Sequence, residues 1–231
     1  MSEIIYGKNS LDAALQNKRV IKAYILEQSP YIKRFQQEKI PYQICKRSYL
    51  DKLSKSGNHQ GIVAEVKEYK TCSVKDMLRE KNGLIVMLDG LKDPHNLGAI
   101  IRTCDAAGVD GVIYKKHNAV HLNDTVAKVA SGALEYVKVA EVNSLANVLE
   151  ELKKEGYWVI GTDAAGQIAY DRQDYDMNIV MVIGSEGEGL SRLVKEKCDF
   201  MISLPMLGHV NSLNASVAAG ILIYNIIAKR K

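Results

Sequence analysis

The sequence lacks a hydrophobic run long enough to span a membrane. Its longest apolar segment, residues 217–228, is shorter than the roughly 20 residues that a bilayer requires, and Asn225 interrupts it. The first residues also lack the basic stretch and the apolar run of a signal peptide, so we expect none. Together these absences predict a cytoplasmic protein that has no membrane partner.

Cysteine is scarce and scattered, and no Cys-x-x-Cys pair occurs. The four cysteines are Cys45, Cys72, Cys104 and Cys198. This spacing argues against both a disulfide framework and a zinc ribbon. His117 and His121 are four residues apart, so on a helix they would share a face, but no carboxylate accompanies them in a recognisable metal pattern. We therefore interpret them as loop or surface histidines and predict no metal site.

The phosphate-binding residues of nucleotide enzymes are missing from the glycine-rich loop at residues 184–189. The loop has no Gly-Lys-Ser/Thr, and Arg192 stands where a dinucleotide fingerprint would place its third glycine. Glu186 and Glu188 would also repel a phosphate. The loop is either a plain turn or a site for a ligand that is not an anion. S-adenosylmethionine, which has a positive sulfonium and no phosphate, meets that requirement.

Basic residues are concentrated at the start of the chain. Residues 1–70 contain 13 Lys and Arg against 7 Asp and Glu, whereas residues 71–231 contain 18 against 20. This division favours a module that binds a polyanion attached to a separate unit, and an incidentally basic surface is the alternative.

Two kinds of pattern divide the chain into two domains and a linker. Residues 1–68 alternate short strand and helix patterns typical of a small α/β unit, and residues 69–83 form a charged linker. From residue 84 onward, apolar runs typical of fully buried strands alternate with helical patterns. The predicted strands are 84–88, 112–114, 157–161, 179–183 and 200–204, and the predicted helices are 96–107, 145–155 and 213–228. Residues 84–231 thus predict a parallel sheet covered on both faces.

Polar residues gather where strands end, which is where open α/β sheets bind their ligands. Asn96 follows Asp93-Pro94 and is well suited to cap the helix that follows. Arg102 lies in an otherwise largely apolar helix, either as a structural ion-pair partner or as a group that faces a site. Before the last helix, one of Ser212, Asn214 and Ser216 must be the N-cap, and the others are free to bind a ligand.

Three ordered motifs resemble the SpoU–TrmH family of RNA 2′-O-ribose methyltransferases, within the SPOUT class. They are Asn96-Leu-Gly-Ala-Ile-Ile-Arg102, Ile183-Gly-Ser-Glu186-Gly-Glu-Gly-Leu, and Ile202-Ser-Leu-Pro-Met followed by Ser212-Leu-Asn214-Ala-Ser. Residues 59–64, His-Gln-Gly-Ile-Val-Ala, end a segment that resembles the ribosomal-protein-like substrate-binding domain of several members. The whole chain looks most similar to members that methylate a guanosine ribose in 23S rRNA.

The resemblance implies more than the residue patterns do. It implies a trefoil knot in the C-terminal domain, a homodimer, and S-adenosylmethionine held by backbone groups near Gly184, Leu204 and Leu213. The family's catalytic positions match five residues of this chain, which are Asn96, Arg102, Glu186, Ser212 and Asn214.

The motifs imply a chemistry and leave the RNA target open. Methylation of tRNA or of another rRNA nucleotide is the nearest alternative, and a non-catalytic RNA-binding assembly factor is the other. A guanidinium is effectively always charged, so we expect Arg102 to hold the substrate phosphate and hydroxyl rather than to accept a proton. The basic surface of the N-terminal domain is expected to capture the RNA through phosphate contacts.

Overall fold

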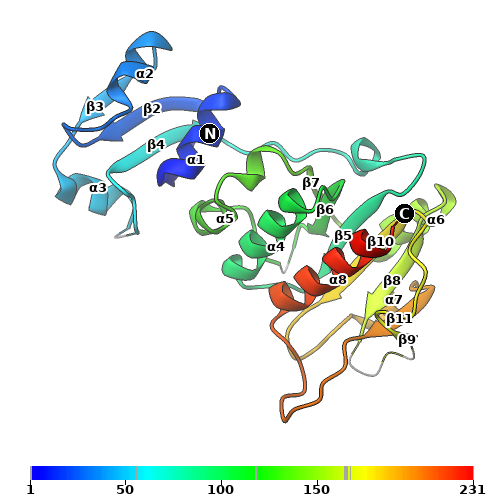
Figure 1. Cartoon of the computed structure of the whole chain (residues 1–231). Helices are drawn as coiled ribbons and strands as arrows, with labels where there is room; N and C mark the ends of the chain where they lie inside the picture. The colour runs from blue at the N-terminus through cyan, green and yellow to red at the C-terminus, as the bar shows by residue number, and fades with distance from the viewer. Residues whose placement is uncertain (1, 56, 118, 164–165, 167, 231) are drawn as a thin grey trace. The chain divides into compact units, whose positions relative to one another are not determined.

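The computed structural model describes the whole chain except residues 1, 56, 118, 164, 165, 167 and 231 (Figure 1). The chain forms two compact units. Unit 1 comprises Met1–Lys70 and Leu122–Tyr136, and unit 2 comprises Thr71–His121 and Val137–Lys231. Among the described residues, no helix has both the length and the apolar content needed to cross a membrane.

Unit 1 is built on a four-stranded sheet with the order β1-β4-β2-β3. Its strands are β1 (Ser2–Tyr6), β2 (Val20–Ile25), β3 (Tyr42–Ile44) and β4 (Ile62–Lys67), and its helices are α1 (Lys8–Gln16), α2 (Ile32–Gln37), α3 (Arg47–Leu53), α5 (Asp124–Ala130) and the 3-10 turn η2 (Ala133–Glu135). Strand β1 and helix α3 come from segments for which the sequence patterns predict no element. Helix α5 contacts β1, which explains why residues from the middle of the chain belong to this unit.

Unit 2 contains a parallel sheet with the order β7-β6-β5-β10-β8-β11-β9 over the described residues. Its strands are β5 (Leu84–Asp89), β6 (Gly111–Lys115), β7 (Val139–Val142), β8 (Trp158–Thr162), β9 (Ile168–Ala169), β10 (Ile179–Gly184) and β11 (Phe200–Ser203). All six residues of β5 are buried. The parallel sheet predicted from the continuous apolar runs is therefore confirmed, and the trefoil knot stays a prediction.

Helices cover both faces of this sheet. They are η1 (Val74–Met77), α4 (Pro94–Ala106), α6 (Leu145–Lys154), α7 (Arg192–Lys195) and α8 (Ala215–Lys229). Ile85 and Met87 of β5 pack in a core with side chains from α6, together with Val194 of α7. The alternate residues of β5 point to the opposite face, where α4 and α8 pack against each other (Figure 1).

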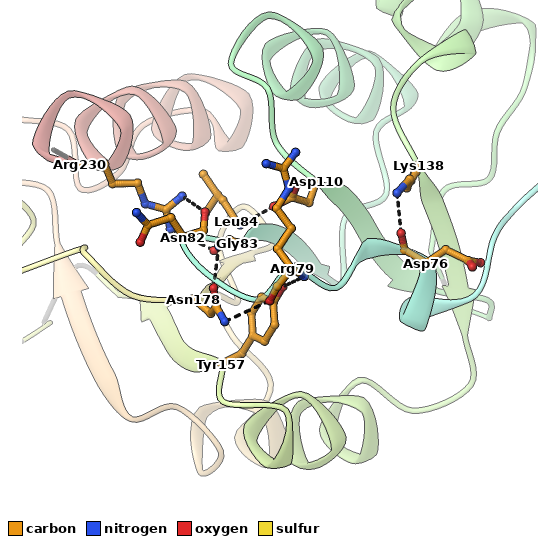
Figure 2. A network of polar contacts seen from close by, with 10 residues as sticks. All are labelled: Asp76, Arg79, Asn82, Gly83, Leu84, Asp110, Lys138, Tyr157, Asn178 and Arg230. Atoms are coloured by element: carbon orange, nitrogen blue, oxygen red, sulfur yellow. Dashed lines mark hydrogen bonds and ion pairs between the residues drawn. The ribbon is translucent and has the colours of Figure 1, made fainter.

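Most of the predicted linker is fastened to unit 2. Met77 lies in the core of that unit. Figure 2 shows how the segment after it is held: the Arg79 amide donates to the Tyr157 hydroxyl at 2.9 Å, and the Gly83 amide donates to Asn178 Oδ1 at 2.7 Å. Arg230, at the end of the last helix, donates to the Asn82 carbonyl at 2.6 Å. These bonds fix the start of β5 and therefore the strand that leads to the site.

Candidate active site

The polar loops of unit 2 meet where the central strands end. The register pairs Gly184 of β10 with Asp89 of β5, so the loops that follow these strands begin side by side. Asp89 also accepts a hydrogen bond from the Ser191 amide at 2.7 Å, which ties the far end of the β10 loop to β5. A cavity of about 550 Å³ lies at this edge of the sheet. The site therefore forms at the carboxyl ends of parallel strands, as expected.

The glycine-rich loop after β10 folds back on itself. Ser185 and Gly189 exchange two backbone hydrogen bonds of 3.1 Å each. Gly187 and Gly189 adopt φ values of +90° and +67°, which side chains other than glycine rarely tolerate. A Cβ on Gly184 would lie 2.4 Å from the carbonyl carbon of Gly189. The glycines therefore allow a narrow turn, and its residues line the cavity.

Three residues that are far apart in the sequence form one hydrogen-bonded group, the Asn96–Glu186–Asn214 cluster. Glu186 Oε1 accepts from Asn96 Nδ2 at 3.0 Å and from Asn214 Nδ2 at 2.7 Å. Asn214 Nδ2 also donates to Asn96 Oδ1 at 2.9 Å. The backbone amide of Ala215, at the start of α8, donates to the same Glu186 oxygen at 3.1 Å. These bonds join the starts of two helices to the glycine-rich loop.

The prediction that Asn96 caps α4 is wrong. Asp93 is the N-cap, and its side chain accepts from the His95 amide at 2.9 Å. Asn96 is the third residue of the helix, in its first turn, and its buried side-chain amide contacts Glu186. Proline is favoured at the first helical position, where its missing amide hydrogen costs nothing, so the helix begins at Pro94 and the cap is the residue before it.

Asn214 is the N-cap of α8, one of the three candidates for that role. Its Oδ1 accepts from the amides of Ser216 and Val217 at 3.0 and 3.3 Å. The same side chain uses its Nδ2 in the cluster. One asparagine therefore starts the helix and holds Glu186 at the same time.

The structure places most of the predicted site residues around the cavity. Gly184, Leu204 and Leu213, the expected cofactor positions, line it together with Ser212 and Glu186. Ser212 is exposed, and no hydrogen bond joins its side chain to the cluster in the described part of the chain. Residues from separate loops thus line a single cavity.

Arg102 does not join the cluster. It lies six residues beyond Asn96 in α4, about 9 Å along the helix axis. Its side chain is exposed, and within the described residues it has neither an ion pair nor a hydrogen bond. The interpretation of Arg102 as a structural ion-pair partner is therefore not supported by this chain, and the guanidinium is free to meet a ligand.

The ionisable side chains that line the cavity are mostly acidic. Glu186, Glu188 and Asp163 contribute carboxylates, and Lys195 is the cation among the lining residues that the structure describes. Lys195 pairs with Asp163 at 2.5 Å, so its charge is already balanced. Asp163 was missed by sequence reasoning, although it follows the end of β8 directly and that position could have signalled it. The apolar walls and the excess of carboxylates suit a ligand that carries positive charge and no phosphate.

A second cavity of about 220 Å³ shares a wall with the first. Ser185, Glu186 and Glu188 line both cavities. Asn96 and Lys92 line the second one. Glu186 of the cluster therefore stands between two spaces, which is the arrangement that a transfer reaction between two ligands needs.

The basic surface expected in residues 1–70 is smaller than the count of charges indicates. Arg19 is mostly buried, forms an ion pair with Glu135, and lies 3.6 Å from the centroid of the Tyr69 ring. Burial, followed by the Glu135 carboxylate, raises the pKa of Tyr69 to about 12. Arg34 pairs with Asp12 and Glu38. These two arginines are therefore engaged within unit 1.

Comparison with known proteins links both units to RNA modification. Residues 83–224 match the SpoU rRNA Methylase family, and residues 4–72 match a family described as RNA 2′-O ribose methyltransferase substrate binding. A protein of Bacillus subtilis (strain 168) is 44% identical over 99% of this chain and 96% of its own length. A protein of Staphylococcus aureus (strain COL) is 45% identical over 98% of this chain and 96% of its own length. Both carry the description TrmH family tRNA/rRNA methyltransferase.

A solved structure shows the same fold. The SpoU methyltransferase AviRb from Streptomyces viridochromogenes, in complex with AdoMet, superimposes with a TM-score of 0.85. It is 23% identical, and the match covers 98% of this chain and 89% of that one. At this identity the likeness concerns the fold, and the fold extends over both units.

Proposed function

Because the chain belongs to the SpoU rRNA methylase family, we propose that it methylates the ribose 2′-hydroxyl of a guanosine in 23S rRNA with S-adenosylmethionine. The observation that carries the proposal is the acidic cavity beside the Asn96–Glu186–Asn214 cluster. Residues 84–231 form the methyltransferase domain in this proposal, residues 1–68 bind the RNA, and residues 69–83 connect the two in a cytoplasmic enzyme.

The cavity fits S-adenosylmethionine by its charge and its walls. When bound, this cofactor supplies a methyl group activated by a positive sulfur. Backbone groups near Gly184, Leu204 and Leu213 would hold it, since all three positions line the cavity. The carboxylates of Glu186 and Glu188 favour positive charge there, and they disfavour a nucleotide with phosphates. In this proposal the reaction uses no metal ion.

The cluster and its neighbours would position the acceptor ribose. A hydroxyl is a weak nucleophile until its proton is removed or strongly polarised. Asn96 and Glu186 orient the reacting group, while Ser212 and Asn214 shape the loop and bind the ribose or the RNA backbone. Arg102 holds the substrate phosphate and hydroxyl and stabilises the negative charge that develops on the oxygen.

Replacing Arg102 by lysine tests this role. We expect Arg102→Lys to retain little methyl transfer, because a point charge does not reproduce the fork of donors in a guanidinium. Stability should remain within about 0.5 kcal/mol, because the side chain is exposed and carries no hydrogen bond within the described residues. Transfer of a labelled methyl group to RNA and thermal unfolding measure the two quantities. Turnover near that of the wild type would contradict the role.

We further propose that the enzyme works as a homodimer. Val217, Ile221 and Tyr224 are 49%, 38% and 50% exposed and recur at helical spacing on one face of α8. Such an apolar stripe is typical of an interface. A second copy packed on α8 would cover it. Light scattering measures the molar mass of the wild type and of Ile221→Glu. We expect the wild type to be a dimer and the charged variant to be a monomer.

The target nucleotide is tested by mapping 2′-O-methylation across rRNA and tRNA from cells with and without the protein. We expect one guanosine of 23S rRNA to lose its methyl group. The main alternative is tRNA or another rRNA nucleotide, because the relatives' descriptions include both kinds of RNA. Loss of methylation at a tRNA position would establish that alternative. Unchanged methylation in both RNAs would contradict the proposed function.

A further inference from the structure

The described aromatic side chains of unit 1 differ in what their rings contact. Phe35 is fully buried, and the rings of Tyr31 and Tyr42 each lie 5.9 Å from it. Tyr69 is covered by Arg19, and Lys128 lies 5.2 Å from the Tyr6 ring. These rings are occupied by packing or by a cation within unit 1.

Tyr24 and Tyr49 instead pack against each other at the surface. Their ring centroids are 5.9 Å apart and the rings are tilted by 54°. Tyr24 comes from β2 and Tyr49 from α3, which follows the edge strand β3 (Figure 1). Tyr49 remains 42% exposed. Tyr49 therefore offers aromatic surface to a partner, whereas the half-buried Tyr24 ring supports it and has Lys22 over it.

Polar and basic groups border this pair on the same face of the sheet. Lys22 and Tyr24 are two residues apart in β2, so their side chains share a face, and the register places Gln43 of β3 opposite Tyr24. Lys22 Nζ lies 4.8 Å from the Tyr24 ring centroid and donates to Gln43 Oε1 at 3.0 Å. Glu65 shares this face but accepts a hydrogen bond from Ser2. We call Lys22, Tyr24, Gln43 and Tyr49 the tyrosine patch.

Further cations lie next to the patch at the start of α3. Lys46 and Arg47 are exposed, and their side chains have no ion pair or hydrogen bond within the described residues. Lys52, one turn after Tyr49, is exposed as well. The acid nearest in sequence, Asp51, contacts His59. Lys46, Arg47 and Lys52 thus give the α3 side of the patch a positive charge, whereas Glu65 lies opposite Lys22 on its other side.

We propose that the tyrosine patch binds unpaired bases of the RNA substrate by stacking, with Lys46 and Arg47 holding the adjoining phosphates. This inference rests on the proposed function, because it takes RNA as the substrate. Bases that are splayed out of a helix stack on aromatic side chains, whereas paired bases do not expose their faces. The patch therefore selects a single-stranded segment of the substrate rather than a duplex.

The test uses the full chain, a short single-stranded RNA with a fluorescent 2-aminopurine base, and a duplex of the same sequence. We expect Tyr49→Ala to weaken binding of the single strand by about tenfold. Tyr49→Phe should bind like the wild type, because the ring remains. The slope of log affinity against log salt should not change, because no phosphate contact is lost. Lys46→Ala should lower that slope by about one.

Tyr136→Ala is the matched control, because Tyr136 is another exposed tyrosine of unit 1, at 53%, outside the patch. Its affinity should equal that of the wild type. Tyr49→Leu keeps an apolar contact with Tyr24, and it replaces Tyr49→Ala in the binding test if the alanine variant does not fold. Wild-type affinity in both Tyr49→Ala and Tyr49→Leu, or an equal loss for the duplex, would overturn the proposal.

Binding of S-adenosylmethionine is measured in parallel on the same proteins. The Tyr49 variants should bind it like the wild type, since the patch belongs to unit 1 and the cavity to unit 2. If the wild type binds no S-adenosylmethionine but Tyr49→Ala weakens RNA binding, only the proposed function is contradicted. If the wild type binds S-adenosylmethionine and the Tyr49 variants bind RNA like the wild type, only the stacking site is contradicted.

Discussion

At the scale of single residues, Asn214 has two tasks that substitution can separate. Its Oδ1 caps α8 and its Nδ2 holds Glu186. Asn214→Ala should lose both, lowering the free energy of unfolding by about 1 kcal/mol through the missing cap and abolishing most methyl transfer. Asn214→Ser keeps a capping oxygen and loses the amide. We therefore expect it to be nearly as stable as the wild type and almost as inactive as the alanine variant.

Chemical denaturation and methyl transfer to RNA check the two quantities for Asn214. The pair of variants is its own control, because serine and alanine differ by the hydroxyl that can cap the helix. A serine variant with full activity would show that the amide does not matter to the reaction.

The reactivity of Cys198 and its contribution to stability should both depend on pH. Burial raises the pKa of its thiol to about 11, from an ordinary value of 9.0. Because the pKa is raised in the folded chain, its contribution to stability is full below pH 9 and is lost as the pH rises toward 11. At pH 8 the folded chain should hold about 100-fold less thiolate at this position than the unfolded chain. Iodoacetamide should accordingly modify Cys198 slowly.

Peptide mass spectrometry after timed alkylation measures that reactivity. The rate should increase about tenfold per pH unit up to near pH 11. The same cysteine in denaturant is the control, and equal rates in the folded and unfolded chain at pH 8 would refute the prediction.

At the scale of elements, the turn after β10 depends on close contact between backbones. A methyl group on Gly184 would meet the Gly189 backbone at 2.4 Å, so Gly184→Ala should force the loop open at a cost of about 1–3 kcal/mol. We expect binding of S-adenosylmethionine to weaken by tenfold or more, as calorimetry would measure. Gly208→Ala is the control, because its Cβ would meet nothing within 4 Å. Equal affinities in the two variants would be evidence against a tight turn.

At the scale of the whole molecule, Arg19 joins parts of unit 1 that are 116 residues apart in the sequence. It pairs with Glu135 and donates through Nε to the Lys67 carbonyl at 3.0 Å. Arg19→Ala should lower the free energy of unfolding by about 3 kcal/mol, because it leaves a buried carboxylate without its partner. Hydrogen exchange should increase around residues 67–69 and 133–136 together.

Lys33→Ala controls for the loss of a positive charge in unit 1, because Lys33 is exposed. Its stability should change by less than about 0.5 kcal/mol. An Arg19→Ala protein as stable as Lys33→Ala would show that the ion pair is not a structural link.

The fold could be predicted from local patterns because buried parallel strands are apolar throughout. Residues 84–88 and 179–183 signalled the centre of the sheet in this way, and both lie in neighbouring strands. Strand β1, helix α3 and helix α5 have weaker patterns, since their contacts are shared between distant segments. Nothing local indicates that Asp124–Ala130 packs against Ser2–Tyr6.

The sequence by itself determined the kind of site: glutamates in a glycine-rich loop, no phosphate-binding residues, and polar groups at strand ends. Only the tertiary structure decided which of these groups meet. It joined Asn96, Glu186 and Asn214, left Arg102 apart from them, and committed Arg19 to Glu135. The physical reason is that charge and backbone freedom belong to each residue, whereas hydrogen bonds between residues 28 to 118 positions apart depend on how the strands and helices pack.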